Sequence, residues 1–95
     1  MMDAYKLDTT GYESIPARTM AAIELYVKRG IETGGFLKAV ICNDLNGAVS
    51  HADSDNLAAL PDIVKFFYNR CPAGCSGSVE RFEYWLRLGG IESVM

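Results

Sequence analysis

The chain has 95 residues, of which 49% are hydrophobic, and its formal net charge is −3. This length corresponds to one domain, and the hydrophobic fraction is sufficient for a small core, which excludes a disordered chain. Positions 1–52 carry five basic and six acidic residues and positions 53–95 carry four and six, so the sequence lacks the basic cluster that binding to nucleic-acid phosphates requires.

The N-terminal segment, residues 1–14, has no sustained hydrophobic periodicity. Thr9-Thr10-Gly11 is typical of a turn. We therefore expect an extended N-terminal arm. The arm residues expected to lie across the helices are Tyr5, Leu7 and Tyr12.

A first helix is predicted to begin near Ser14-Ile15-Pro16 and to end at Gly30. Proline suits the first helical position because its fixed φ already matches the helix, and glycine readily adopts the left-handed C-cap conformation. Lys28 and Arg29 fall in the last turn, where the helix dipole favours cations. The apolar stripe consists of Pro16, Met20, Ile23 and Val27, with Tyr26 at its edge.

The segment from Gly34 to Cys42 has two interpretations. Its β-branched and aromatic residues suit a buried strand, although only Lys38 supplies the polar alternation of a strand. A single helix explains more, because apolar residues keep helical spacing over the longer run. Those residues are Leu37, Ile41, Leu45, Ala48 and Ala52. We predict a helix with a kink or break near Asn43-Asp44, where Asp44 can cap a new start.

The segment from Asp53 to Cys71 is the predicted central helix. Asp, Ser and Asn at its start are good N-caps, and Pro61 should either kink the helix or mark the first turn of a shorter one. The predicted core stripe is Leu57, Leu60, Val64, Phe67 and Cys71, widened by Ala59, Ile63 and Phe66. A helix apolar over so much of its circumference must contact several neighbours.

The last predicted helix begins after Ser78, a good N-cap, and ends at Gly89-Gly90. Its predicted buried stripe is Val79, Phe82, Trp85 and Leu86. Together these elements predict an all-α fold, a compact single domain of about four helices packed around the central helix Asp53 to Cys71. The expected divisions are an N-terminal arm at 1–14, a helical domain at 15–90 and a C-terminal tail at 91–95.

Cysteine and histidine offer the candidates for site chemistry. Three cysteines, an odd number, favour reduced thiols. A zinc set is conceivable, composed of Cys42, Cys71, Cys75 and His51, but its spacing is not that of a zinc finger, and thiols also serve as small core residues. We predict no metal, no cofactor and no catalytic residue, because no nucleophile or metalloprotease motif accompanies His51. His51 is expected to end a helix and to face water.

A glycine pair could hold an anion at a helix start. Gly34-Gly35 lacks the Gly-x-Gly-x-x-Gly pattern, so an ordinary turn between helices is the favoured interpretation. The sequence also has no signal-peptide core and no apolar run approaching the ~20 residues of a membrane span. We therefore expect a cytoplasmic protein without a membrane segment.

Two surface patches are predicted to bind a partner. The first combines uncharged amides, a glycine that permits close approach and apolar groups, and consists of Phe36, Val40, Asn43, Asn46, Gly47 and Ser50. The second lies on the last helix and consists of Tyr84 and Leu88. In the opposite interpretation, the arm buries Phe36 and Val40, and the tail buries Tyr84 and Leu88.

The run Gly-Gly-Phe-Leu-x-Ala-Val-x-x-Asn-Asp-Leu occupies positions 34–45, and several shorter matches follow it. They are Ala52-Asp53, Asn56, Ile63-Val64, Tyr68-Asn69, Cys71-Pro72 and Gly77-Ser78. This pattern, over residues 15–88, resembles a family of small proteins encoded by tailed bacteriophages and prophages. Many members of that family have Trp where this chain has Ser76. The family has no known activity, so the resemblance implies a phage origin and a bacterial-cytoplasm setting but no catalytic residue.

Small acidic phage proteins without an enzyme signature often act by binding, and some block a host or defence protein, as anti-CRISPR proteins do. We therefore expect a non-enzymatic protein-binding module that inhibits or modulates a host or defence-system protein. A homodimer is also compatible with the sequence, because the exposed apolar groups exceed what one small core can cover. Two further functions compete with protein binding: that of a small nucleic-acid-binding regulator, and that of a zinc- or thiol-dependent protein.

Overall fold

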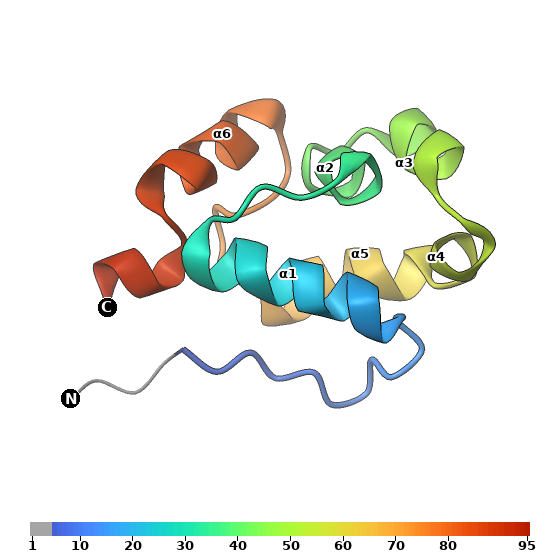
Figure 1. The fold of residues 1–95 in the computed structure, drawn as a ribbon, viewed down its shortest axis with the longest axis horizontal. Helices are drawn as coiled ribbons and strands as arrows, with labels where there is room; N and C mark the ends of the chain where they lie inside the picture. Colours follow the sequence, from blue (N-terminus) through green and yellow to red (C-terminus); the bar gives the residue numbers. More distant parts are fainter. Residues whose placement is uncertain (1–4) are drawn as a thin grey trace.

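The computed structural model describes residues 5–95, and in that part of the chain it contains six α-helices, one short 3-10 helix and no β-strand (Figure 1). The elements are α1 (Ala17–Arg29), α2 (Gly35–Ile41), α3 (Leu45–His51), α4 (Ser54–Ala58), α5 (Leu60–Arg70), α6 (Val79–Leu88) and η1 (Ile91–Val94). The predicted all-α class and the helical interpretation of Phe36 to Cys42 are confirmed. The predicted arrangement of four helices differs, because two of the expected helices are each divided in two.

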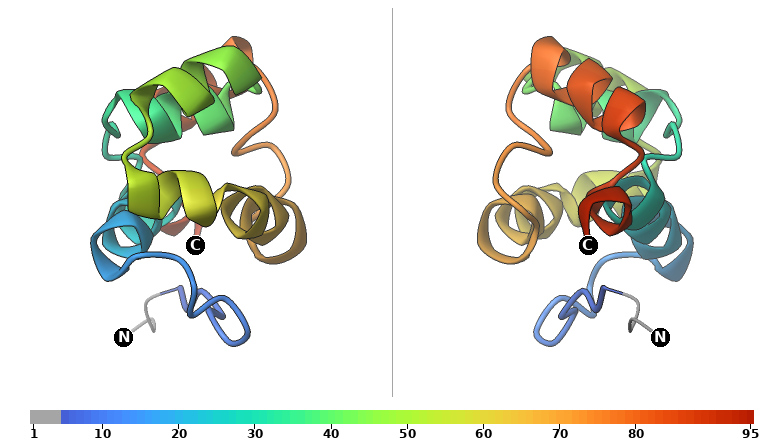
Figure 2. Two further views of the ribbon diagram at one scale, coloured as in Figure 1. Left: turned by 90° about the vertical axis from the view of Figure 1, so that its right-hand side faces the viewer. Right: turned by 90° about the vertical axis from the view of Figure 1, so that its left-hand side faces the viewer.

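The helices form two layers. In Figure 1, α1, α4 and α5 lie in the lower layer, and α2, α3 and α6 lie above them; the two side views of Figure 2 agree. The fully buried side chains shared between the layers are Ile23, Tyr26, Val27, Ile41, Ile63, Phe66 and Cys75. The core therefore lies between the layers and does not surround one central helix.

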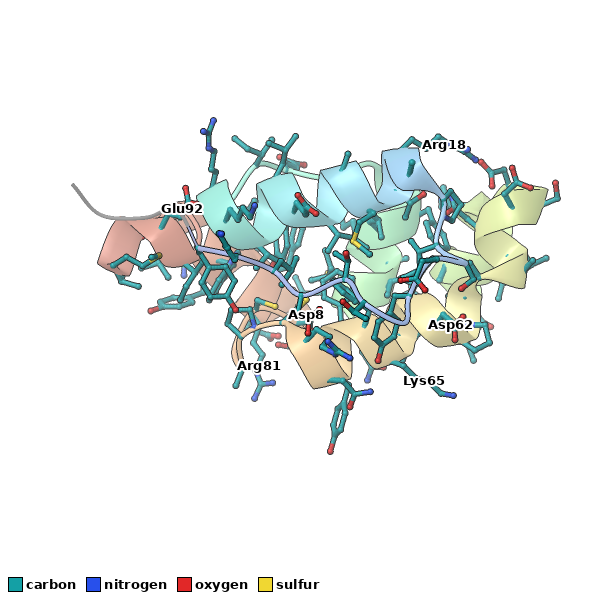
Figure 3. All side chains as sticks on the ribbon, turned by 90° about the horizontal axis from the view of Figure 1, so that it is seen from below. Asp8, Arg18, Asp62, Lys65, Arg81 and Glu92 are labelled. Atoms are coloured by element: carbon teal, nitrogen blue, oxygen red, sulfur yellow. The ribbon has the colours of Figure 1, made fainter. Side chains whose placement is uncertain are left out.

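The segment that precedes α1 runs beneath the lower layer (Figure 3). Tyr5, Leu7 and Tyr12 are partly buried and contact the core. Tyr12 meets Phe66 edge-on, with ring centroids 5.1 Å apart, and its hydroxyl accepts a hydrogen bond from Asn69 at 3.0 Å. These contacts cover the lower side of α5.

Helix α1 begins directly after Pro16 and ends at Gly30, as predicted. Gly30 has φ +67°, and its backbone N–H donates to the carbonyls of Leu25 and Tyr26. A Cβ at Gly30 would lie 2.8 Å from the backbone nitrogen of Gly90. Glycine is therefore required both for the left-handed cap and for the close crossing of the two chain segments.

The α2–α3 pair is broken where the sequence predicts. The Asp44 side chain caps α3 by accepting from the Gly47 N–H at 3.0 Å, and Asn43 adopts a left-handed φ of +63°. The break changes the direction of the chain, and of the apolar stripe expected to continue into α3, Ala48 is buried but Leu45 is not. Leu45 is 69% exposed, which corrects its predicted place in the core.

The predicted central helix divides into α4 and α5, with Pro61 in the first turn of α5. Asp53 caps α4 by accepting from the Asn56 N–H at 2.8 Å. Ile63, Phe66 and Phe67 are buried as predicted. Leu57 and Val64 are about half exposed, which corrects their predicted place in the core. The break at Ala59 separates α4 from α5. The apolar positions of the two helices therefore do not follow one continuous helical periodicity.

Helix α6 begins after Ser78, whose side chain accepts from the Arg81 N–H at 3.1 Å, and ends at the left-handed Gly89. Phe82 and Trp85 are buried as predicted, but Val79 is 50% exposed, which corrects its predicted burial. The expected C-terminal tail forms η1, which contacts α1. No helix within residues 5–95 combines the length and apolar composition that crossing a bilayer requires.

Candidate functional site

A groove runs between the α2–α3 pair and α5. It consists of two adjoining cavities of about 470 Å³ and about 210 Å³, which share the lining residues Val40, Asn43 and Val64. We call this depression the α5 groove. Its other lining residues are Ala39, Asp44, Leu45, Ala48, Leu60, Phe67, Tyr68, Cys71, Pro72, Ala73, Gly74, Ser76, Gly77 and Arg81.

One wall of the α5 groove is an apolar stripe along α5. Leu60, Val64, Phe67 and Cys71 recur at helical spacing and all line the groove. The sequence assigns this stripe to the core. Phe67 is buried as predicted and Leu60 and Cys71 are partly buried against the core, but the stripe also borders the groove. Val64 is 50% exposed and Tyr68, at the edge of the stripe, is 88% exposed.

The opposite wall comes from the end of α2 and the start of α3. Ala39 and Ala48 are buried at its base, and Leu45 projects from its rim. Asn43 lines both cavities from the left-handed turn between the helices. The wall is thus mostly apolar, with the Asn43 amide and the Asp44 carboxylate as its polar groups.

A loop, residues 71–77, closes one end of the α5 groove and is fixed at several points. The backbone N–H of Gly77 donates to the carbonyl of Ile41 at 2.7 Å, and the Tyr26 hydroxyl donates to the carbonyl of Cys75 at 2.7 Å. The Arg81 guanidinium donates to the carbonyl of Ser76 at 3.0 Å. Figure 3 shows Arg81 beside this loop and Lys65 on the outer edge of α5. Arg81 therefore supplies a positive charge at the closed end of the groove.

The structure brings together only part of the first predicted surface. Val40 and Asn43 line the α5 groove, whereas Asn46 and Ser50 are exposed on α3 outside both cavities. Phe36 is only 9% exposed and belongs to the core, which corrects its predicted place on a binding surface. Its side chain packs with the other buried residues of the core.

Gly47 has a structural role in the turn between α2 and α3. A Cβ at this position would overlap Oδ2 of the Asp44 carboxylate, whose other oxygen, Oδ1, accepts the cap hydrogen bond. The absence of a side chain therefore permits the break between α2 and α3, and close approach of a partner is not needed to explain it.

The second predicted patch lies apart from the α5 groove. Tyr84 is 51% exposed on α6, and Leu88 is partly buried against the core. Neither residue lines the groove. Sequence reasoning missed Leu45, Val64, Tyr68 and Arg81 as groove residues. The apolar stripe of α5 could have indicated two of them, Val64 and Tyr68, had its burial not been assumed.

Cys71 and Cys75 both belong to the loop, where Cys71 lines the α5 groove and Cys75 is fully buried. Interaction with Cys75, followed by burial, raises the pKa of the Cys71 thiol. Cys42 lies elsewhere, in a separate cavity of about 480 Å³ that His51 also lines. Burial raises the pKa of Cys42, so this thiol stays protonated at neutral pH and is a poor nucleophile.

His51 is the last residue of α3 and is exposed, as predicted. Its Nδ1 lies 2.8 Å from the carbonyl oxygen of Gly47, which favours a proton on Nδ1. Within residues 5–95, no group of three or more His, Cys, Asp or Glu side chains is arranged to hold a metal ion. The four residues of the conceivable zinc set therefore do not converge.

Comparison of the chain with protein-family models, with curated proteins and with solved structures finds no match. The α5 groove is consequently defined by the geometry of this chain alone. Its chemistry is that of a partly apolar depression with exposed leucine, valine and tyrosine side chains, one amide, one carboxylate and one guanidinium.

Proposed function

We propose that this chain is a non-enzymatic protein-binding module and that the α5 groove is its contact surface. The observation that carries the proposal is the exposure of large apolar side chains around one depression. Tyr68, Leu45 and Val64 are 88%, 69% and 50% exposed. Apolar groups gathered in this way on a small protein are typical of a surface that a partner covers.

The composition of the groove also suits a protein partner. Tyrosine and arginine are enriched among the residues that contribute most to protein interfaces, and here Tyr68 and Arg81 line the same cavity. A partner that inserts an apolar side chain between α3 and α5 would cover Val64 and meet the phenol ring of Tyr68. A partner carboxylate at the closed end would meet Arg81.

A protein partner fits the charges better than nucleic acid does. Arg18 forms an ion pair with Asp53 at 2.7 Å, Lys28 pairs with Glu24 at 3.7 Å, and Arg70 pairs with Asp8. Basic side chains that are already paired with carboxylates release fewer counterions from phosphate. We therefore favour protein binding over nucleic-acid binding.

The identity of the partner class rests on the sequence resemblance to small phage proteins. We propose that the chain acts in the bacterial cytoplasm on a host or defence-system protein and inhibits or modulates it by covering a functional surface. An anti-defence role of the anti-CRISPR kind belongs to this proposal. The α5 groove supplies the surface, and the resemblance supplies the setting.

The test compares two tyrosines that are exposed on different elements. Tagged wild-type protein, Tyr68→Ala and Tyr84→Ala are used to capture partners from a lysate of the bacterial host, and each captured protein is quantified by mass spectrometry. Tyr68→Ala should reduce the capture of the specific partner by about tenfold or more, as loss of an interface anchor does, whereas Tyr84→Ala should retain it.

Two outcomes would contradict the assignment of the α5 groove. Equal capture by wild type and Tyr68→Ala would remove the groove from the interface. Loss of the partner with Tyr84→Ala alone would move the interface to α6. The oligomeric state is measured beside each capture, since a dimer that Tyr68→Ala dissociates would identify a second copy of this chain as the occupant of the groove.

A further inference from the structure

The two charged side chains that line the α5 groove lie at its opposite ends. Asp44 lines only the smaller cavity, which Leu60 at the start of α5 also lines. Arg81 lines only the larger cavity, which Cys71 at the end of α5 also lines. A helix rises about 16 Å from position 60 to position 71. The groove therefore has a negative end and a positive end that are about three turns of α5 apart.

Both charges are available to a partner. Within residues 5–95, neither Asp44 nor Arg81 belongs to an ion pair. The Oδ1 atom of Asp44 caps α3, and Oδ2 accepts no hydrogen bond from the part of the chain that the structure describes. The exposed Arg81 guanidinium donates to the carbonyl of Ser76, and its remaining N–H groups can donate to a carboxylate.

The surface between the two charges is apolar and extends along one helix. Val64 lines both cavities, and Tyr68, one turn later, lines the larger one. Leu45 projects from the opposite wall. Adjoining cavities in a row along α5 suit the side chains of successive turns of a second helix, which recur at i, i+3 or i+4, and i+7. An occupant of this length needs apolar side chains on one face only.

The α5 groove suits a helix better than an extended segment. Within residues 5–95 there is no β-strand, so the groove offers no strand edge that an extended peptide could join. In the closing loop, the carbonyls of Cys75 and Ser76 already accept from Tyr26 and Arg81. An extended segment would cover its own N–H and C=O groups against apolar walls, whereas a helix pairs these groups internally.

We propose that the α5 groove binds an amphipathic α-helix of about three turns that runs antiparallel to α5. This inference rests on the proposed function and specifies the partner segment that the groove takes. The apolar face of the partner helix covers Val64 and Tyr68. Acidic residues in its first turn meet Arg81, and basic residues in its last turn meet Asp44.

The direction of the partner helix follows from its own dipole. Acidic side chains stabilise the first turn of a helix and basic side chains stabilise the last turn. In the antiparallel direction, the charges that Arg81 and Asp44 select are also those that the helix ends favour. In the parallel direction, the same selection would place basic residues in the first turn and acidic residues in the last turn, which destabilises the partner helix.

The test uses the full chain and a displayed library of random peptides of about 16 residues, long enough for three turns with flanking residues. Peptides are selected on wild-type protein, and those that also bind Tyr68→Ala are removed; Tyr68 is 88% exposed, so this variant keeps the fold. Enriched peptides should carry apolar residues at helical spacing, with Asp or Glu before them and Lys or Arg after them. Apolar residues at every second position, basic residues first, or no enrichment at all would overturn the inference.

An exchange of charges tests the direction of the bound helix. Fluorescence anisotropy measures the dissociation constant of the enriched peptide for wild type, Arg81→Glu and the control Arg87→Glu. Arg87 is exposed on the same helix and lines neither cavity. Arg81→Glu should weaken binding by about threefold to tenfold, because attraction is replaced by repulsion, and Arg87→Glu should leave it unchanged. Equal losses for the two variants would contradict contact with Arg81.

A second peptide, with lysine in place of the acidic residues of the first turn, should show the reverse order. It should bind wild type about threefold to tenfold more weakly than the original peptide does, and Arg81→Glu should bind it more tightly than wild type does. The wild-type measurement also covers the case in which Arg81→Glu disturbs the loop by losing the hydrogen bond to Ser76. Equal affinity of wild type for both peptides would refute the antiparallel direction.

Capture of the partner from the lysate separates this inference from the proposed function. A partner that is lost with Tyr68→Ala, together with a selection that yields no helical peptide, would refute the helical occupant and leave the α5 groove as the contact surface. Helical peptides with the expected order of charges, together with equal capture by wild type and Tyr68→Ala, would refute the proposed function and leave the groove's preference for a helix standing.

Discussion

The hydroxyl of Tyr26 provides a direct test of how the fold holds the loop of the α5 groove. Tyr26 is fully buried in α1, and its ring stacks on Phe82 with centroids 5.6 Å apart. Its hydroxyl donates to the carbonyl of Cys75 at 2.7 Å. Tyr26→Phe keeps the ring and removes only the hydroxyl, so the carbonyl of a fully buried residue loses this hydrogen bond.

The size of the effect follows from the kind of group that is lost. Leaving a buried polar group without its hydrogen bond costs about 1–3 kcal/mol. A chain of this length is expected to have a free energy of unfolding of about 5–14 kcal/mol, so the loss is a substantial fraction. For a domain of this size, 1 kcal/mol corresponds to about 4–8 °C in melting temperature.

Urea unfolding of wild type, Tyr26→Phe and the matched control Tyr84→Phe measures this difference. Tyr84 is half exposed, so removal of its hydroxyl should change the free energy of unfolding by less than about 0.5 kcal/mol. The reasoning fails if Tyr26→Phe unfolds at the same urea concentration as wild type, or if the two variants are destabilised equally.

Alkaline pH gives the same experiment a second readout. Burial, followed by the nearby Cys75, raises the pKa of Tyr26 above its ordinary value of 10.0. The neutral phenol is thus favoured in the folded state, so its contribution to stability is fully present below pH 10 and is lost as the pH rises above 10. The stability advantage of wild type over Tyr26→Phe should therefore shrink above pH 10, and a constant difference up to pH 11 would contradict this account.

Two further substitutions test the corrected surface and the α2–α3 break. Phe36→Ala should destabilise the fold by about 3–5 kcal/mol in urea unfolding, because Phe36 is a core residue; an unchanged melting transition would restore its predicted place on a binding surface. Gly47→Ala should cost about 1–2 kcal/mol, because the new Cβ displaces the Asp44 carboxylate from the α3 cap. Gly34→Ala is its control, since a Cβ at Gly34 meets nothing within 4 Å, and comparable losses for the two glycine variants would argue against the Asp44 explanation.

The sequence predicted the helix ends well because these ends depend on local chemistry. Asp44, Asp53 and Ser78 each accept a hydrogen bond from a backbone N–H three residues later, and Gly30 and Gly89 adopt left-handed C-caps. Such interactions are formed within one turn. They can be read from residue type and spacing without knowledge of the fold.

The faces of the helices were predicted less well, because periodicity identifies an apolar side but not what covers it. In the stripe assigned to the core, Phe67 is buried and Leu60 packs against the core, but Val64 is half exposed and lines the α5 groove. The buried polar Asn56 was also missed as a core contact. Its Oδ1 accepts from the Thr19 hydroxyl at 2.6 Å, across 37 positions of sequence, and no local pattern contains that pairing.

The candidate site was predicted only in part for the same reason. Val40 and Asn43 were expected on a contact surface and do line the groove. Tyr68 and Arg81 reach the same cavity from α5 and α6, and their convergence depends on how the two layers pack. Sequence spacing carries no information on that packing.

The position of Tyr26 has a kinetic consequence. Its carbonyl accepts from the indole N–H of Trp85 at 3.0 Å, 59 positions later in the chain, and its hydroxyl meets the loop 49 positions away. Contacts of such large sequence separation cost loop-closure entropy and slow the search for the native topology. Trp85 is the single tryptophan, so its fluorescence should report when the C-terminal third of the chain docks onto the first helix during refolding.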